Sequence, residues 1–265
     1  MIQLPTQRSE VVNYNPKLLI ISGKPKSGKS TVVAALEDNL VIDLEDGYRS
    51  LSVMKVQART SSDLFEIRDA ILAKGKEMKK IPYRFITIDN ATRLEEVSMS
   101  YAADLYRATP MGAGWGYLTD KKGMLVKDAQ GKPVPDPAAD VKQLPNGSGW
   151  LYSRLAIRKL IDMFKPLCET LILVTHIKDK QIRKNGTEMS EMSVDLSGKT
   201  GDIICGEADA VGYLYRDSNK TYLSFEGGED VIREARPLHL RGKKFKVIES
   251  DDQNNLNIDV KQLFI

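Results

Sequence analysis

The chain has 265 residues, of which 42% are hydrophobic and 28% are charged, and its formal net charge is +3. These values are typical of a globular protein, and the charge is too small to indicate nucleic-acid binding by itself. The two cysteines, Cys168 and Cys205, form no Cys-x-x-Cys pair, which argues against a metal knuckle and a disulfide framework. Without a signal peptide or a stretch of 18 apolar residues, a cytoplasmic protein with no membrane segment is expected.

From residue 17 onward, apolar runs alternate with helical patterns, after a polar stretch that predicts an extended N-terminal arm over 1–16. The pattern predicts strands over 17–22, 39–45, 84–90 and 170–176, and helices over 30–39, 61–80, 92–108 and 151–167. Thr92 and Glu95 have the spacing of a capping box at the start of the third helix. This order of elements predicts an α/β fold with a mostly parallel sheet covered on both faces.

The pattern changes after about residue 205. Residues 208–216 and 220–228 alternate between apolar and polar side chains around "DSNK", which predicts an antiparallel hairpin, and 236–248 adds one or two short strands before a tail over 249–265. Residues 109–149 are rich in glycine and proline and predict an insertion, with a small hairpin over 123–135. A loop of this length is usually functional or mobile.

The segment "GKPKSGKS" matches G-x-x-x-x-G-K-[ST] and lies between a predicted strand and a predicted helix. Glycines allow such a loop to aim backbone N–H groups at phosphates, and the helix N-terminus favours negative charge. Lys29 is expected to reach the β- and γ-phosphates of ATP, and Ser30 to bind Mg²⁺. The residues predicted to hold the nucleotide are Gly23, Lys24, Pro25, Lys26, Ser27, Gly28, Lys29, Ser30 and Thr31.

A magnesium site needs a second anchor, and Asp89 at the end of "FITIDN" is the candidate. The alternative is that Asp89 caps the helix that follows. GTP as the nucleotide is disfavoured, because the one Asn-Lys pair, Asn219-Lys220, lacks the aspartate of N-K-x-D. Asn90 stands where many ATPases place a glutamate after the metal aspartate, so a group that activates water must come from another strand.

Glu45, at the carboxyl end of the predicted strand 39–45, is the candidate for that water-activating group. The carboxyl ends of strands in open α/β sheets point at the ligand crevice, which would place Glu45 beside the phosphates. The alternative is a solvated acidic cluster formed with Asp43 and Asp46.

The order of "IDLEDG", "ITIDNATRL" and "LILVTH" after the phosphate loop resembles the RecA-type ATPases, most closely the short phage RecA-like proteins of single-strand annealing. The resemblance covers roughly residues 17–248 without the insertion, and it implies a RecA-like P-loop NTPase domain there. It implies that Glu45 activates water, that Asp89 binds Mg²⁺ and that His176 senses the γ-phosphate. A histidine at a strand end is also commonly a capping or core residue.

The same resemblance implies that residues 177–201 contact single-stranded DNA, through Lys178, Lys180, Arg183 and Lys184. This segment lacks aromatic residues for base stacking, which departs from the expectation. Trp115 and Tyr117 of the insertion could supply stacking or could simply be packed, and the segment could also be a solvated hairpin.

The resemblance further implies a homo-oligomer, a ring or a filament, in which Arg236 acts on the neighbour's nucleotide. Arg233 is a rival for this role, and either arginine could be a surface residue. The overall prediction is a Mg²⁺-dependent ATPase of phage recombination, annealing or replication in the host cytoplasm, with a single-strand-binding protein as a further partner. The alternatives are a small-molecule P-loop kinase, against which the lack of arginine in 109–149 argues, and a nucleotide-dependent switch with little turnover.

Overall fold

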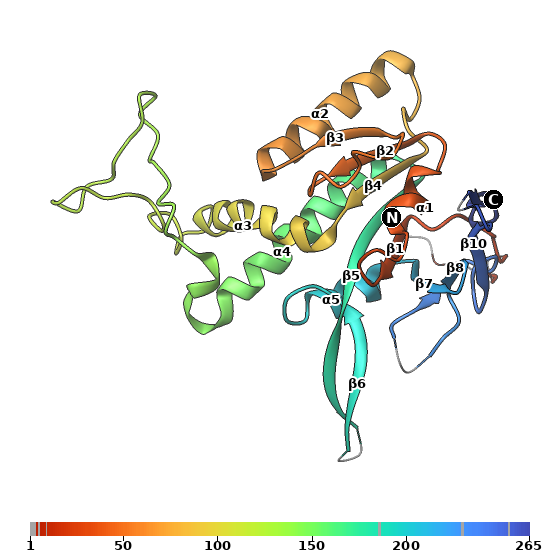
Figure 1. Cartoon of the computed structure of the whole chain (residues 1–265). Helices are drawn as coiled ribbons and strands as arrows, with labels where there is room; N and C mark the ends of the chain where they lie inside the picture. Colours follow the sequence, from red (N-terminus) through yellow and green to blue (C-terminus); the bar gives the residue numbers. More distant parts are fainter. Residues whose placement is uncertain (1–3, 5, 9, 185–186, 229–230, 254) are drawn as a thin grey trace.

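A single sheet of eleven strands organises the chain in the computed structural model (Figure 1). The structure describes residues 4, 6–8, 10–184, 187–228, 231–253 and 255–265, and it describes side chains in all of these except 182–190. The strands are β1 (Leu18–Gly23), β2 (Asn39–Asp43), β3 (Met54–Gln57), β4 (Phe85–Asp89), β5 (Thr170–Lys184), β6 (Thr187–Val194), β7 (Ala210–Asp217), β8 (Lys220–Ser224), β9 (Glu234–Ala235), β10 (Lys244–Ser250) and β11 (Leu256–Ile258).

The strand order is β11-β10-β8-β7-β1-β5-β4-β2-β3. The run from β7 to β3 is parallel, whereas β8, β10 and β11 join in antiparallel fashion. Every residue of β1, β2 and β4 is buried, as expected for strands covered on both faces. The predicted α/β fold, a mostly parallel sheet with C-terminal antiparallel strands, is therefore confirmed.

Helices cover the two faces of the sheet unequally. The helices are α1 (Lys29–Ala34), α2 (Ser61–Met78), α3 (Ala91–Arg107), α4 (Ser148–Phe164) and α5 (Thr200–Glu207), with single 3₁₀ turns at Val141–Gln143, Pro145–Gly147, Lys165–Leu167 and Lys261–Leu263. One hydrophobic core packs α2, α3, α4 and α5 on the sheet, and a second core packs α1 with the C-terminal strands. Val260 and Leu263 of the tail belong to the second core, and Leu256–Ile258 of the tail form an edge strand of the sheet. No helix within the described ranges is long and apolar enough to cross a membrane.

The start of α3 differs from the predicted capping box. Asn90 caps the helix, because its side chain accepts a hydrogen bond from the Arg93 N–H. Thr92 and Glu95 hold a later segment instead: the Thr92 hydroxyl donates to the Asp195 carbonyl, and Glu95 accepts from the Ser197 N–H. The prediction was wrong because both side chains have tertiary partners, which lie far away in the sequence. A capping box is found at α2 instead, between Thr60 and Asp63.

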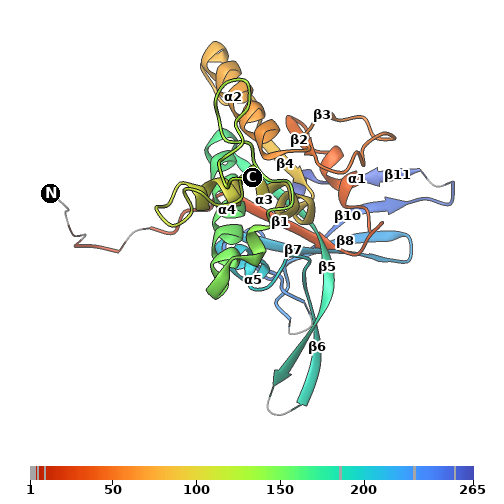
Figure 2. The same cartoon turned by 90° about the vertical axis from the view of Figure 1, so that its left-hand side faces the viewer.

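The predicted strand 170–176 continues beyond His176 to Lys184 and pairs with β6 in an antiparallel ribbon that projects from the sheet (Figures 1 and 2). The pairing of 177–184 with 187–194 confirms the hairpin that was one alternative for 177–201. Sequence patterning ended the strand at residue 176 and so missed its continuation into this hairpin. It also missed β3, whose residues are mostly exposed, and the short helix α5.

The insertion projects from the ends of α3 and α4 (Figure 1). Its folds are closed by isolated bridges, Thr119 with Leu125, Lys127 with Pro133 and Tyr117 with Pro135, so the predicted hairpin over 123–135 is part of a larger folded-back loop. Trp115 and Tyr117 pack around the Arg107 guanidinium, whose carbon lies 5.8 and 4.6 Å from the two ring centroids. These aromatic residues thus pack at the root of the insertion.

Substitution of two leucines of α4 tests how this helix packs on the sheet. Leu160 is 0% exposed and Leu151 is 53% exposed. We expect Leu160→Ala to lower the free energy of unfolding by about 2–5 kcal/mol, because it removes buried methyl groups and leaves a cavity. Leu151→Ala should cost less than about 1 kcal/mol. Urea denaturation of both variants measures the difference, and equal losses would contradict the placement of α4.

Cys168 and Cys205 are free, buried thiols. Burial raises the pKa of both to about 12. Because the thiolate is the reactive form, only about one thiol in ten thousand is reactive at pH 8. We expect a disulfide reagent such as DTNB to label neither cysteine in the native protein and both in guanidinium chloride. Rapid labelling of the native protein would show that these sites open readily.

Candidate nucleotide-binding site

The phosphate loop joins β1 to α1, and two of its glycines are required by its geometry. A Cβ on Gly23 would lie 2.6 Å from the Leu214 carbonyl oxygen of the neighbouring strand β7. Gly28 has a φ of 102°, which is strained for any residue with a side chain. The loop can therefore wrap closely against β7 and turn sharply into the N-terminus of α1, which is the geometry of a phosphate-binding loop.

Lys29 is folded back over this loop. Its Nζ lies 2.8 Å from both the Gly23 and Lys24 carbonyl oxygens and 3.3 Å from Nδ1 of His176. The sheet brings His176 there, because β5 pairs with β1 in a register that sets it opposite Gly23. Burial lowers the pKa of Lys29 to about 8, against the opposing charges of Asp89 and Glu45. The predicted phosphate lysine and the predicted sensor are thus direct neighbours.

Asp89 faces the phosphate loop from the end of β4. Its Oδ2 accepts hydrogen bonds from the Ser30 hydroxyl at 3.2 Å and from the Tyr48 hydroxyl at 2.5 Å. Burial raises the pKa of Asp89, and these two hydrogen bonds oppose the rise. The alternative role of Asp89 as a helix cap is excluded, because the next residue, Asn90, caps α3.

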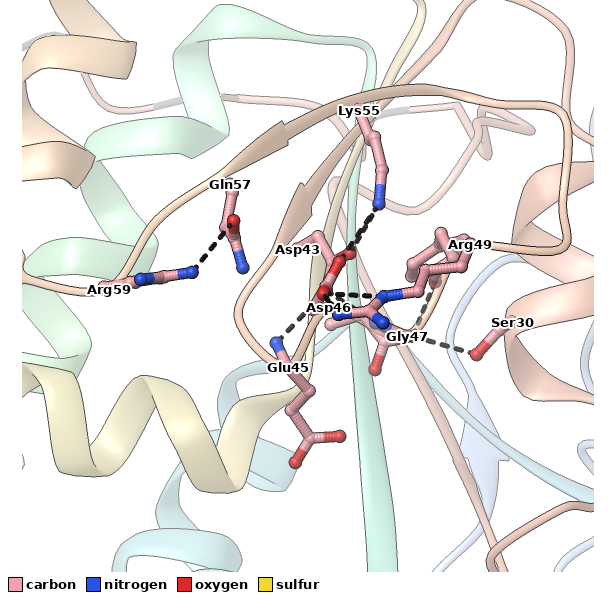
Figure 3. A network of polar contacts seen from close by, with 11 residues as sticks. Ser30, Asp43, Glu45, Asp46, Gly47, Arg49, Lys55, Gln57 and Arg59 are labelled. Carbon is pink, nitrogen blue, oxygen red and sulfur yellow. Dashed lines mark hydrogen bonds and ion pairs between the residues drawn. The ribbon is translucent and has the colours of Figure 1, made fainter.

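Asp43 shapes the loop that carries Glu45, as Figure 3 shows. The buried Asp43 carboxylate accepts hydrogen bonds from the N–H groups of Glu45 and Gly47 at 3.1 and 3.2 Å, and it pairs with Lys55 at 3.3 Å. Asp46 pairs with Arg49 and Lys55. The Glu45 carboxylate points away from these cations and makes none of the hydrogen bonds or ion pairs found among the described residues. The three acidic residues are therefore not one solvated cluster.

These groups surround one cavity of about 260 Å³ at the carboxyl ends of the central strands. Of the predicted site residues, the cavity brings together Lys26, Gly28, Lys29, Ser30, Thr31, Glu45, Asp89 and His176. Lys24, Pro25 and Ser27 line an adjacent groove on the other side of the loop. The structure thus places a basic phosphate loop, a histidine and three carboxylates, those of Asp43, Glu45 and Asp89, around one space.

The donor set fits Mg²⁺. This ion keeps several waters and is usually held by one or two carboxylates together with substrate phosphates. Ser30 and Asp89, already in contact, are the side chains that would hold it. No group of three or more histidine, cysteine or acidic side chains able to hold a metal without substrate occurs in the described part of the chain.

The remaining predicted residues lie elsewhere. Arg236 is at the opposite end of the sheet, where its guanidinium contacts the Gly206 carbonyl at 2.8 Å and Asp209 at 3.6 Å. Lys178 pairs with Asp195 at 3.3 Å, and Lys180 pairs with Asp202 at 2.8 Å. The rival Arg233 donates to the Glu226 carbonyl at 2.5 Å. The side chains of Arg183 and Lys184 lie outside the described residues.

Four residues that line the cavity were not among the predicted site residues: Asp43, Gly47, Tyr48 and Arg216. Tyr48 is 2% exposed and holds Asp89, and Arg216, at the end of β7, lines the cavity. The Arg216 side chain takes part in no hydrogen bond or ion pair among the residues that the structure describes, while its backbone pairs with Thr221. The signal for Arg216 was available, because the end of any strand that neighbours β1 reaches the phosphate edge. Nothing in the sequence marked Tyr48, whose role depends on how residues 44–53 fold back.

A strand, a phosphate loop and a helix, with a serine and an aspartate in contact beside a buried lysine, define a P-loop nucleotide-binding protein. The model of the AAA domain family matches residues 15–134 and 135–237, so the chain belongs to this family of ATPases. Such proteins generally use ATP with Mg²⁺. Among solved structures, the chain is similar to a KaiC-like protein of the hyperthermophilic archaeon Pyrococcus horikoshii, with 13% identity, a TM-score of 0.45 and coverage of 93% of this chain and 91% of that one. A search of curated proteins finds no match.

The hydrogen bond from Tyr48 to Asp89 generates a prediction about magnesium. We expect Tyr48→Phe to raise the Mg²⁺ concentration that half-saturates nucleotide binding by about tenfold, because the partners that orient a metal ligand typically contribute this much. Fluorescence titration of a labelled ATP analogue with Mg²⁺ measures it. Tyr83→Phe is the control, since the Tyr83 hydroxyl contacts Lys74 at 3.1 Å, away from the cavity. Equal Mg²⁺ requirements in both variants would contradict the role of Tyr48.

Proposed function

We propose that this protein hydrolyses ATP to ADP and phosphate with Mg²⁺, and that it binds single-stranded DNA in phage recombination, annealing or replication. The observation that carries the proposal is the arrangement of Lys29, Ser30, Asp89 and Glu45 around one cavity. The DNA-related part rests on the sequence resemblance to phage RecA-like proteins.

Each group of this chain has a chemical task in the proposed hydrolysis. Glu45 accepts a proton from the attacking water as the water oxygen bonds to the γ-phosphorus and the bond from phosphorus to the ADP oxygen breaks. Lys29 exchanges its hydrogen bonds to backbone carbonyls for phosphate oxygens and stabilises their charge. Bound Mg²⁺, held at Ser30 and Asp89, supplies neutralisation of phosphate charge.

His176 is suited to report the state of the γ-phosphate. Nδ1 of His176 contacts Nζ of Lys29. A γ-phosphate that draws Lys29 toward itself would break this contact and leave Nδ1 to a different partner. The same strand then continues into the ribbon with β6. The proposed signal from nucleotide to DNA would therefore pass along the backbone of β5.

The location of Arg236 supports a head-to-tail homo-oligomer. A residue that acts on a neighbour's nucleotide must lie on a surface other than the one that holds its own nucleotide. Arg236 meets this condition, since it lies beside Asp209 at the amino end of β7 while the phosphate loop is at the carboxyl ends of the strands. We propose that it acts in this way in a ring or a filament.

The kinase alternative has no support in the placement of the insertion. A lid would have to line the nucleotide cavity, but none of the cavity's described lining residues comes from 109–149. The alternative of a switch with little turnover is separated from an ATPase by the behaviour of Glu45.

The proposal predicts that Glu45→Gln lowers the rate of ATP hydrolysis by at least about 100-fold while ATP binding is retained, because a general base contributes that much or more. Phosphate release, measured with and without single-stranded DNA, tests it, and we expect DNA to stimulate the wild type.

Asp46→Asn is the matched control for Glu45→Gln. It changes the next carboxylate of the same loop, which pairs with Arg49 and Lys55 instead of facing the cavity. We expect its rate to stay within a few-fold of the wild type. Turnover that is insensitive to Glu45→Gln would favour the switch, and turnover that depends on Glu45 but not on DNA would retain the ATPase and remove DNA as its activator.

A further inference from the structure

A second hollow, which we call the tyrosine groove, lies beside the phosphate loop and has a volume of about 580 Å³. Its wall is formed by Tyr213 and Tyr215 of β7, by Lys24 and Lys26 of the phosphate loop and by Met192 at the base of the ribbon. Segments that are far apart in the sequence therefore line one surface depression.

The charge of the tyrosine groove is of one sign. Its described lining includes Lys24, Lys26, Arg216 and Arg233, and no acidic side chain is among those lining residues. The Lys24 and Lys26 side chains are exposed. A polyanion complements such a surface, whereas a basic or neutral partner does not explain four cations around one hollow.

A row of tyrosine rings continues this wall across the hairpin of β7 and β8. The ring centroids of Tyr213 and Tyr215 are 5.6 Å apart with planes inclined by 21°, and those of Tyr215 and Tyr222 are 5.8 Å apart and inclined by 29°. Tyr215 and Tyr222 are half-buried, and Lys244 Nζ lies 5.2 Å from the Tyr222 centroid. Aromatic rings interspersed with cations are the surface on which unpaired bases stack while their phosphates are neutralised.

The ribbon offers less to a nucleic acid than its composition suggests. Lys178 and Lys180 are engaged by Asp195 and Asp202, and residues 177–201 contain no aromatic side chain. The tyrosine groove, at the base of this ribbon, has aromatic side chains, which the ribbon lacks. Arg216 lines the groove and the nucleotide cavity alike, so a phosphate in either hollow is within the surroundings of the same guanidinium.

We propose that the tyrosine groove binds single-stranded DNA, with bases stacked on Tyr215 and Tyr222 and backbone phosphates at Lys24, Lys26 and Arg216. This inference rests on the proposed function and assigns the DNA contact to the β7–β8 hairpin. It also places the DNA against the outer side of the phosphate loop, so that nucleotide and DNA are bound on two sides of one short segment.

The test is binding of a fluorescent oligo(dT) to the full-length protein by anisotropy, with a non-hydrolysable ATP analogue present. We expect Tyr215→Val and Tyr222→Val each to weaken binding by roughly 5- to 100-fold, since stacking contributes about 1–3 kcal/mol per base. Tyr215→Phe keeps the ring and should bind within about twofold of the wild type. Tyr14→Val, which removes an exposed tyrosine that does not line the groove, is the matched control and should leave affinity unchanged.

The outcomes separate this inference from the proposed function. If the wild type binds oligo(dT) and both valine variants bind equally well, the groove is overturned while DNA binding stands. If the wild type binds no oligo(dT), both fail together. If Tyr215→Val changes the oligomeric state without DNA and binding per oligomer is unaltered, the groove is a contact between copies of this chain and the inference is overturned.

Photocrosslinking keeps the inference testable where a valine variant fails to fold. Wild-type protein is irradiated with an oligonucleotide that contains 5-iododeoxyuridine, and the crosslinked peptides are mapped by mass spectrometry. Crosslinks at Tyr215 or Tyr222 support the groove. Crosslinks confined to 177–201 or to 109–149 overturn it.

Discussion

The parallel register of four strands is the constraint on which the nucleotide site depends. β1 sets Gly23 opposite His176 of β5, β4 sets Asp89 opposite Val174, and β2 sets Asp43 opposite Asp89. Because side chains on a strand alternate between faces, a shift of one residue in any pair would turn the end residue to the other face. Fully buried hydrophobic runs fix this register, so the core that stabilises the fold also aligns the chemistry.

The hydrogen bonds around the site divide the acidic residues by task. Asp43 accepts hydrogen bonds from the backbone of the loop that it supports, and Asp46 forms ion pairs with Arg49 and Lys55. Asn90 caps α3, so the Asp89 carboxylate is available to accept hydrogen bonds from Ser30 and Tyr48. Glu45 retains a carboxylate without a described hydrogen bond, beside the phosphate loop. Neighbouring residues of similar chemistry thus acquire different roles from their partners alone.

The sequence predicts best those features that depend on local pattern. The phosphate loop, the buried strands and the position of Asp89 follow from apolar runs and from a motif with strict spacing, and the structure places them as expected. Tyr48, by contrast, depends on Asp89, which lies 41 residues away in the chain. Thr92 and Glu95 show the reason: their spacing satisfies a local rule, yet tertiary hydrogen bonds to 195–197 take both side chains. The sequence of one chain does not reveal the interface between subunits, so it does not predict which arginine reaches a neighbouring subunit.

The continuity of β5 has a mechanical consequence. The strand runs without interruption from His176, beside Lys29, to Lys184 in the ribbon. Eight further residues of strand extend about 26 Å at 3.3 Å per residue. A change of about 5° in the direction of the strand at His176 would therefore move the far end of β5 by about 2 Å. The strand would act as a lever that pivots beside the phosphate loop.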